Sequence, residues 1–222
     1  MMTNTVHNTI KILMSNVIVV DVETNGLPLT RGFNNYYDPK NTIYYDTSRM
    51  IELGYIIYSF DGKEIARREF LIKPDKFNIT NSDIHGITFD MANAGLDIRD
   101  AFDIFEIDLL DADRIVAHNV SFDLNVILAE CYRYDRISLI DRLTTIKKEC
   151  TMAMGKEYLK SGRFPALKVL YKTLTNQDVE QQHRALDDSR LCGECYFALK
   201  ALNAIAIADE AEKKIDEKIE KI

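Results

Sequence analysis

The first half of the chain alternates short apolar runs with turn-forming residues, a pattern typical of β-strands. Residues 16–21 form a β-branched apolar run that predicts a strand buried on both faces. Residues 50–60 and 64–72 flank an Asp-Gly pair, which is a strong hairpin signal, and Pro74 ends the second of these strands. The pattern therefore predicts a central strand and a hairpin.

The second half carries apolar residues mainly at helical spacing. A helix is expected over residues 97–110, followed by a short strand over residues 114–118 and a helix with Ser121 as its N-cap. Pro165, at a first-turn position, opens another helix, and a last one begins near residue 185. This order of elements predicts an α/β fold in which helices pack on a mixed sheet that contains a hairpin.

Two segments lie outside this regular pattern. Residues 24–49 are rich in Tyr, Phe, Asn and Pro without a clear period, which predicts a long loop. Residues 204–222 form an amphipathic helical extension of a domain that spans residues 1–203. Its apolar stripe either docks on the domain, which we favour, or contacts a partner; the stripe consists of Ile207, Ala211, Ile215, Ile219 and Ile222.

Length and composition are those of an ordinary soluble globular protein. The 222 residues suffice for one well-buried domain, with 46% hydrophobic and 28% charged residues. Residues 1–16 lack a continuous apolar segment, and no apolar run reaches the roughly 18 residues that a membrane helix needs. We therefore expect a cytoplasmic protein without a secretion signal or a membrane span.

Charge is distributed unevenly along the chain. The net charge of −7 argues against a general nucleic-acid coat protein, which would normally be basic. Residues 142–172 nevertheless carry eight basic and two acidic residues, a net charge of +6. We expect this basic segment to contact phosphates, although a solvated surface would leave the same pattern.

Cys192 and Cys195 have the C-x-x-C spacing of a zinc half-site or a redox motif. No second pair or histidine cluster in the sequence completes such a site, and both cysteines fall in a predicted helix. We therefore expect them to pack as small apolar side chains in a reducing compartment.

Asp21 and Glu23 follow the first predicted strand. Residues two apart on a strand point to the same face, so both carboxylates project together. Like charges at this distance raise each other's pKa unless cations hold them, and the pair therefore suggests a divalent metal site. Taken alone, a solvated strand end is the simpler explanation.

Two further motifs combine histidine and aspartate. His118-Asn-Val-Ser-Phe-Asp123 places Asp123 in the first turn of a helix, where the helix dipole already favours an acid. His183-Arg-Ala-Leu-Asp-Asp188 places His183 just before another helix and Asp188 in its first turns. A neutral imidazole can act as a base while the carboxylate binds metal, but each motif alone also fits a surface or capping role.

The ordered set Asp-x-Glu, His-Asn-x-x-Phe-Asp and His-x-Ala-x-x-Asp resembles the DEDDh 3′→5′ exonuclease family, which includes polymerase proofreading subunits, ribonuclease T and oligoribonuclease. Secondary matches are Thr24-Asn-Gly-Leu27, Ile51-Glu-Leu-Gly54 and Ile84-His-Gly-Ile-Thr88. The resemblance extends over about residues 17–199. It implies a ribonuclease H-like fold, with a mixed five-stranded sheet flanked by helices.

The resemblance also implies roles for individual residues. The metal-binding catalytic carboxylates would be Asp21, Glu23, Asp123 and Asp188, with His183 as the catalytic base. Two Mg²⁺ or Mn²⁺ ions are the implied cofactors, since hard oxygen ligands suit them. His118 would orient the turn of the second motif together with Asn119, whereas Asp187 does not fit the motif spacing. The residues expected to contact the substrate are Thr24, Gly26, Leu27, His85 and Asn119.

The implied substrate is a nucleic acid with a free 3′ end, from which nucleoside 5′-monophosphates are released. We favour single-stranded DNA and a proofreading or repair role; the alternatives are an RNA-trimming exoribonuclease and a catalytically silent nucleic-acid-binding module. Residues 28–49 are longer than the link in compact family members, and would either stack on unpaired bases or form a packed surface loop. The C-terminal helix is a candidate contact for a polymerase or for self-association.

Overall fold

The computed structural model describes residues 16–219, with side chains as far as Ile207 except that of Ala206. Five strands form one mixed sheet: β1 (Asn16–Thr24), β2 (Met50–Tyr58), β3 (Glu64–Leu71), β4 (Ala112–Ala117) and β5 (Lys147–Cys150). The strand order is β3-β2-β1-β4-β5, in which β1 to β3 pair antiparallel and β4 and β5 join in parallel. The predicted α/β fold with a five-stranded mixed sheet is confirmed.

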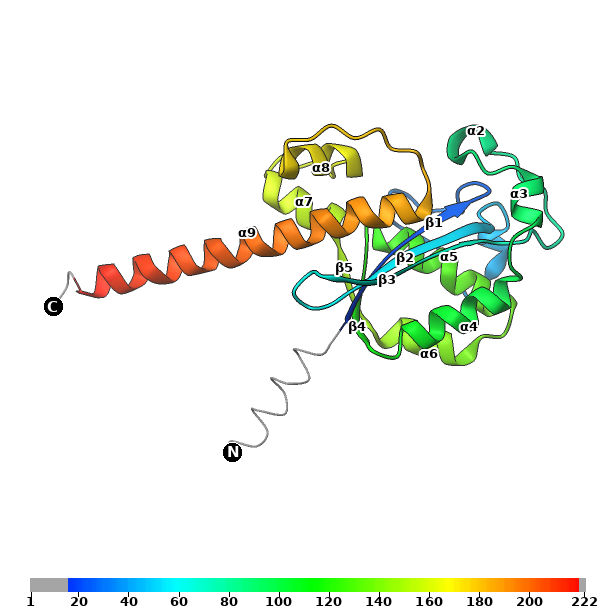
Figure 1. Ribbon diagram of the computed structural model, residues 1–222, viewed down its shortest axis with the longest axis horizontal. Coiled ribbons are helices and arrows are strands. Elements are labelled where there is room, and N and C mark those ends of the chain that lie inside the picture. Colours follow the sequence, from blue (N-terminus) through cyan, green and yellow to red (C-terminus); the bar gives the residue numbers. More distant parts are fainter. Residues whose placement is uncertain (1–15, 220–222) are drawn as a thin grey trace, which may run out of the picture.

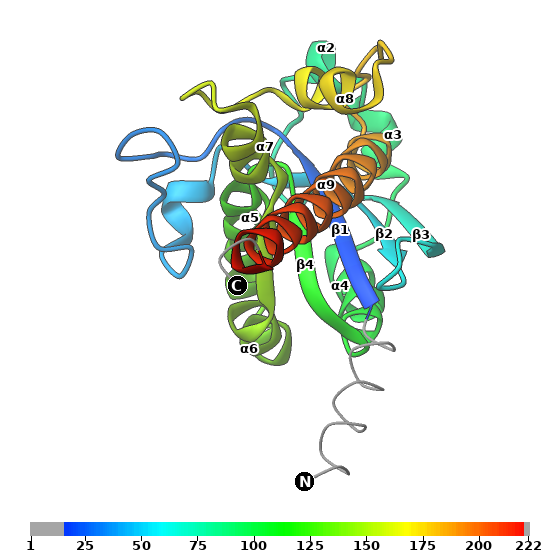
Figure 2. The ribbon, with the colours of Figure 1, turned by 90° about the vertical axis from the view of Figure 1, so that its left-hand side faces the viewer.

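Helices cover both faces of this sheet. They are η1 (Thr42–Tyr45), α2 (Ser82–His85), α3 (Phe89–Asn93), α4 (Ile98–Asp108), α5 (Val120–Arg133), α6 (Ile137–Thr145), α7 (Thr151–Leu159), α8 (Leu167–Thr175) and α9 (Ala185–Ile219). α4, α5 and α6 lie on one face, and α7, α8 and α9 lie on the other (Figures 1 and 2). This arrangement explains why the central strands are apolar on both sides.

The two faces of β1 belong to different hydrophobic cores. Ile18 and Val20 pack in the core that α4, α5 and α6 cover, whereas Val17 and Val19 pack against α8 and α9. β1 continues to Thr24, three residues further than the sequence pattern predicted. The two carboxylates that follow the apolar run therefore lie inside the strand, on the same face as Val17 and Val19.

The N-terminal turns of α9 approach β2 more closely than most side chains would permit. A Cβ atom on Gly54 would lie 2.3 Å from the backbone nitrogen of Leu186 and 2.8 Å from Cβ of Ala185. Ser189 Oγ also donates a hydrogen bond to the Gly54 carbonyl over 3.0 Å. Gly54 thus lets the start of α9 rest directly on the sheet.

Several local predictions need correction. The basic segment over residues 142–172 contains the end of α6 together with β5, α7 and α8, of which the sequence pattern had predicted only the last helix. Ser121 does not cap α5, because the helix starts earlier and Asn119 takes the N-cap position in a left-handed conformation. Pro165 does not stand in the first turn of α8 but precedes the helix, because Ala166 is the N-cap and the helix begins at Leu167.

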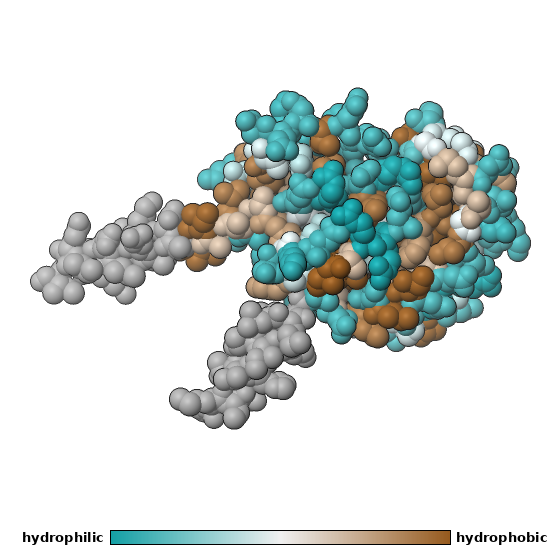
Figure 3. Space-filling model, in the orientation of Figure 1, coloured by the Kyte–Doolittle hydropathy of each residue, from teal (hydrophilic) through white to brown (hydrophobic). Residues whose placement is uncertain are grey.

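The predicted C-terminal extension continues the last helix, which starts at Ala185, close to the residue that the sequence pattern predicted. α9 runs without interruption through residue 219 and extends beyond the sheet (Figure 1). Hydrophobic residues lie where it leaves the body (Figure 3), and Leu202, Ile205 and Ile207 are exposed there. Ala211, Ile215, Ile219 and Ile222 lie outside the described side chains, so docking of the stripe stays a prediction. Among the described helices, none combines the length and apolarity needed to cross a membrane.

We expect Gly54→Ala to destabilise the fold by about 1–3 kcal/mol, because the added methyl group overpacks the contact between β2 and α9. Urea unfolding followed by circular dichroism measures the change. Ser121→Ala serves as the control, since that exposed side chain caps no helix, and its effect should stay within about 0.5 kcal/mol. Equal stability of Gly54→Ala and the parent protein would contradict this account of the close approach.

Candidate active site

Three separate segments bring four carboxylates to one end of the sheet. Asp21 and Glu23 project from β1, and both are partly buried. Asp123 stands in the first turn of α5, where it is buried and its Oδ1 accepts a hydrogen bond from the backbone nitrogen of Val22 over 3.3 Å. That bond ties the second motif to the middle of the first one.

The third segment is the start of α9. Asp188 is buried there, and its Oδ2 accepts a hydrogen bond of 2.7 Å from Nε2 of Gln181. His183 is exposed and adopts a left-handed backbone conformation, with φ of 49°, just before the helix begins. One side-chain ligand atom from each of Glu23, His183 and Asp188 lies within 4.8 Å of the others. The five predicted catalytic residues therefore converge on one site.

The carboxylates share an environment that disfavours negative charge. Burial raises the pKa of Glu23 to about 8, with further contributions from Asp188 and Glu52. Burial also raises the pKa of Asp123 to about 8 and the pKa of Asp21 well above its usual range, the latter increased by the charges of Asp123, Asp188 and Glu23. The pKa of Asp188 is raised by burial as well. A bound cation would lower these pKa values and stabilise the ionised carboxylates.

The donor atoms of the site fit divalent cations. Asp123 Oδ2 and Asp188 Oδ1 are buried and have no hydrogen-bond partner among the described residues. A buried carboxylate oxygen without a partner is costly, and coordination to a cation would remove that cost. Carboxylate oxygens favour Mg²⁺ or Mn²⁺ over soft metals.

Glu52 supports the site, although no role was predicted for it. It is fully buried on β2, directly opposite Glu23 in the strand pairing. Its carboxylate accepts hydrogen bonds from Arg184, at 3.0 Å from Nε, and from the backbone nitrogen of Ala185 at 2.8 Å. Glu52 thereby fixes the start of α9, next to His183. A charged residue inside an apolar strand was the signal in the sequence.

The residues predicted to contact substrate lie around this cluster. Thr24 is buried and donates from Oγ1 to the carbonyl of Gly26 over 2.7 Å, whereas Leu27 is 76% exposed. His85 is buried, and its Nδ1 accepts from the backbone nitrogen of Ile87. Asn119 donates from Nδ2 to the Tyr36 hydroxyl at 3.3 Å. Their contact with substrate stays a prediction.

Three other singled-out groups occupy structural or peripheral positions. His118 is held between Thr151 Oγ1 and the carbonyl of Pro165, both at 3.0 Å, and burial lowers its pKa to about 4. Asp187 is exposed and forms no ion pair with the described residues. Cys192 and Cys195 are buried free thiols, as expected for apolar packing.

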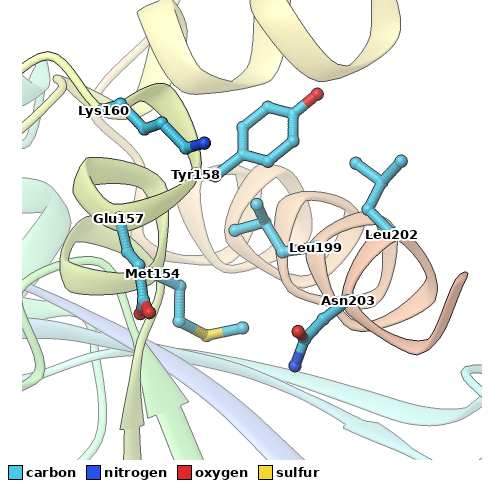
Figure 4. A pocket seen from close by; sticks show the side chains of 7 residues that line it. All are labelled: Met154, Glu157, Tyr158, Lys160, Leu199, Leu202 and Asn203. Carbon is cyan, nitrogen blue, oxygen red and sulfur yellow. The ribbon is translucent and has the colours of Figure 1, made fainter. Parts of the chain in front are cut away.

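A hollow of about 630 Å³ lies away from this cluster, between α7 and α9 (Figure 4). Its lining residues are Met154, Glu157, Tyr158, Lys160, Leu199, Leu202 and Asn203. None of the five predicted catalytic residues is among them. Convergence of carboxylates and histidine, rather than the size of a cavity, therefore marks the candidate active site.

This fold and this cluster define a class of nucleases, and comparisons with known proteins agree. The sequence matches the RNase_T family, described as exonuclease, over residues 18–196. The chain therefore belongs to this exonuclease family, and the resemblance to DEDDh 3′→5′ exonucleases is confirmed. It is accordingly a hydrolase of phosphodiester bonds. A search of curated proteins returned no match.

Solved structures of exonucleases share the fold. Exonuclease X in complex with 5′ overhanging duplex DNA is 21% identical, with a TM-score of 0.56 over 85% of this chain and 93% of that one. E. coli Exonuclease I in complex with a dT13 oligonucleotide is 17% identical, with a TM-score of 0.63 over 84% and 41%. A moderately thermophilic Exonuclease I from Methylocaldum szegediense is 17% identical, with a TM-score of 0.61 over 84% of this chain and 40% of that one. The chain thus spans about two fifths of these Exonuclease I chains.

The carboxylate cluster predicts an unusual pH dependence of stability in EDTA. Because the folded-state pKa values of Glu23 and Asp123 are raised to about 8, the folded protein holds protons that the unfolded chain releases above pH about 4. Stability contributed by these protons is complete at low pH and is lost as the pH rises towards 8. We therefore expect the melting temperature to fall between pH 5 and 8, which differential scanning fluorimetry measures.

Asp123→Asn tests the origin of that fall. The amide oxygen still accepts a hydrogen bond from Val22, but it does not ionise, so the pH dependence should flatten and the melting temperature at pH 8 should rise. A gain of about 1 kcal/mol corresponds to about 2–4 °C for a chain of this size. Asp90→Asn, which alters an exposed carboxylate, should leave the pH profile of the parent protein unchanged. An identical profile for Asp123→Asn would contradict the assignment.

Proposed function

We propose that the protein is a metal-dependent 3′→5′ exonuclease that acts on DNA and releases nucleoside 5′-monophosphates. The observation that carries this proposal is the convergence of four carboxylates and His183, with two buried carboxylate oxygens left without partners. Such a cluster is destabilising by itself, and it becomes favourable when cations bind. Its presence in an exonuclease of the RNase_T family supports a catalytic rather than a silent site.

The four carboxylates, Asp21, Glu23, Asp123 and Asp188, would hold two Mg²⁺ or Mn²⁺ ions. Bound there, the ions supply Lewis acidity for activating water and offset negative charge that develops on the phosphate. Because Arg184 is paired with Glu52, the carboxylate oxygens of the site stay available to the ions. Glu52 and Arg184 act as positioning residues, since they hold the start of α9.

His183 would accept the proton of the attacking water. Its imidazole is exposed beside Glu23 and Asp188, so it can reach a water molecule that lies at the carboxylates. The water oxygen then forms a bond to phosphorus, the bond from phosphorus to the 3′ oxygen breaks, and that oxygen leaves on the shortened strand. The released product carries the phosphate at its 5′ position.

DNA is the favoured substrate because structures of the same fold were solved with DNA: Exonuclease X with 5′ overhanging duplex DNA and Exonuclease I with a dT13 oligonucleotide. RNA trimming is the second candidate, since the motifs are shared with ribonuclease T and oligoribonuclease. Discrimination depends on what meets the 2′-hydroxyl. Degradation of matched 5′-labelled single-stranded DNA, duplex DNA and RNA decides between them.

We expect EDTA to abolish hydrolysis and Mg²⁺ or Mn²⁺ to restore it. His183→Ala should lower kcat by about 10²–10⁴-fold, the usual contribution of a positioned acid–base group, while substrate binding is largely kept. Asp188→Ala should instead weaken metal binding, so a Mn²⁺ titration should recover part of its activity but not that of His183→Ala. Steady-state kinetics at saturating substrate and metal measure both effects.

Gln182→Ala provides the matched control, because this exposed neighbour of His183 belongs to none of the motifs. Its kcat should equal that of the parent protein. Full activity in EDTA would refute the metal mechanism. Parental kcat for His183→Ala would leave the proton transfer without an assigned base.

The polarity of the reaction gives a separate prediction. A strand that ends in a 3′-phosphate presents no free 3′-hydroxyl, and we expect it to be degraded much more slowly than the same strand with a hydroxyl. Gel electrophoresis of a 5′-labelled oligonucleotide should show a ladder that shortens one nucleotide at a time. Early release of the labelled 5′ nucleotide would contradict 3′→5′ polarity.

A further inference from the structure

Two exposed aromatic rings from distant parts of the sequence meet on the surface. Phe33 lies in the long loop between β1 and β2, and Phe164 lies in the connection between α7 and α8. Their ring centroids are 5.4 Å apart at an interplanar angle of 31°. The contact leaves Phe33 72% and Phe164 40% exposed. Most of the Phe33 ring is therefore available to a ligand.

Both segments are anchored at the turn that carries Asp123. The carbonyl of Pro165, next to Phe164, lies 3.0 Å from Nε2 of His118. In the loop that carries Phe33, the Tyr36 hydroxyl accepts a hydrogen bond from Asn119. His118 and Asn119 immediately precede the helix whose first turn contains Asp123. The aromatic pair thus belongs to two segments that are both hydrogen-bonded to the residues just before the helix that carries Asp123.

Positive charge accompanies the rings. Nζ of Lys156 lies 4.4 Å from the centroid of Phe164. Lys160 and Arg163 are exposed in the same connection. None of these three cations forms an ion pair with the described residues. By contrast, Lys147 in the same basic segment is paired with Glu149 at 2.8 Å. Lys156 therefore stands beside the Phe164 ring as a cation without an ion-pair partner among the described residues, and Arg163 directly precedes that ring in the chain.

We propose that Phe33 and Phe164, together with Lys156, form a stacking platform for unpaired bases of the strand whose 3′ end occupies the active site. This inference rests on the proposed function and specifies which form of substrate it takes. Exposed rings next to unpaired cations match the alternation of bases and phosphates in a single strand. Every base offers a π-face, so the platform tolerates any sequence and disfavours paired bases.

If Phe33 served only to pack the loop against the α7–α8 connection, an apolar side chain without a ring would replace it without loss of affinity for a single strand. Leucine at position 33 keeps an apolar contact with Phe164 but cannot stack on a base, whereas tyrosine keeps both. We expect Phe33→Leu to weaken binding of a fluorescent dT12 oligonucleotide about 10-fold in EDTA. Phe33→Tyr should bind the oligonucleotide with the affinity of the parent protein. Fluorescence anisotropy measures the affinity without requiring hydrolysis.

Phe60→Leu is the matched control. Phe60 is also an exposed ring beside an arginine, with Arg114 5.9 Å from its centroid. It follows β2 at the end that pairs with Val17, the opposite end of the sheet from Glu23. Its substitution should leave the affinity for dT12 unchanged. Equal losses in Phe33→Leu and Phe60→Leu, or no loss in either, would overturn the platform.

Substrate length separates the platform from the catalytic centre. With Mg²⁺, Phe33→Leu should raise KM for dT12 about 10-fold, while kcat/KM for a dinucleotide too short to reach the platform stays at the parental value. A parallel loss on both substrates would place Phe33 in the catalytic centre and overturn the proposal. Failure of the parent protein to hydrolyse either substrate would refute the proposed function, yet the anisotropy result would still test the platform.

Discussion

The site depends on the close contact between the start of α9 and strand β2. Gly54 leaves room for the backbone of Ala185 and Leu186, and the buried Glu52 holds the same turn through Arg184 and the backbone nitrogen of Ala185. Because Gly54 pairs with Asp21 and Glu52 pairs with Glu23, this contact lies directly beside the first carboxylate pair. The position of the third motif relative to the first is thus set by packing and by the ion pair between the buried Glu52 and the partly exposed Arg184.

This arrangement concentrates negative charge where it is least stable. Burial raises the pKa of Glu23 and of Asp123 to about 8, and Arg184, whose charge lowers the pKa of Glu23, is already paired with Glu52. The buried carboxylates therefore destabilise the folded state locally, as is common at functional sites. The cations that would relieve the repulsion would also supply the Lewis acidity of the proposed hydrolysis, so binding of the cofactor and assembly of the reactive site would coincide.

The surface around the site is assembled from parts that are remote in sequence. The long loop after β1 and the connection between α7 and α8 meet through Phe33 and Phe164, and each is tied separately to the turn before α5. The basic segment divides accordingly, since Lys147 is neutralised on β5 whereas Lys156 lies against an aromatic ring. A count of charges along the chain does not distinguish these two environments.

The sequence alone determined the fold class, the exonuclease family and the set of five candidate catalytic residues. Strand and helix periodicity is a local property, and an ordered set of motifs keeps its spacing whatever the surrounding packing. β5 and α7 were missed by the pattern, because polar edge strands and short helices carry little periodicity. The role of Glu52 and the meeting of Phe33 with Phe164 were decided by tertiary structure only. Both arise from contacts between segments far apart in the chain, and such contacts depend on how the helices pack on the sheet rather than on any local pattern of residues.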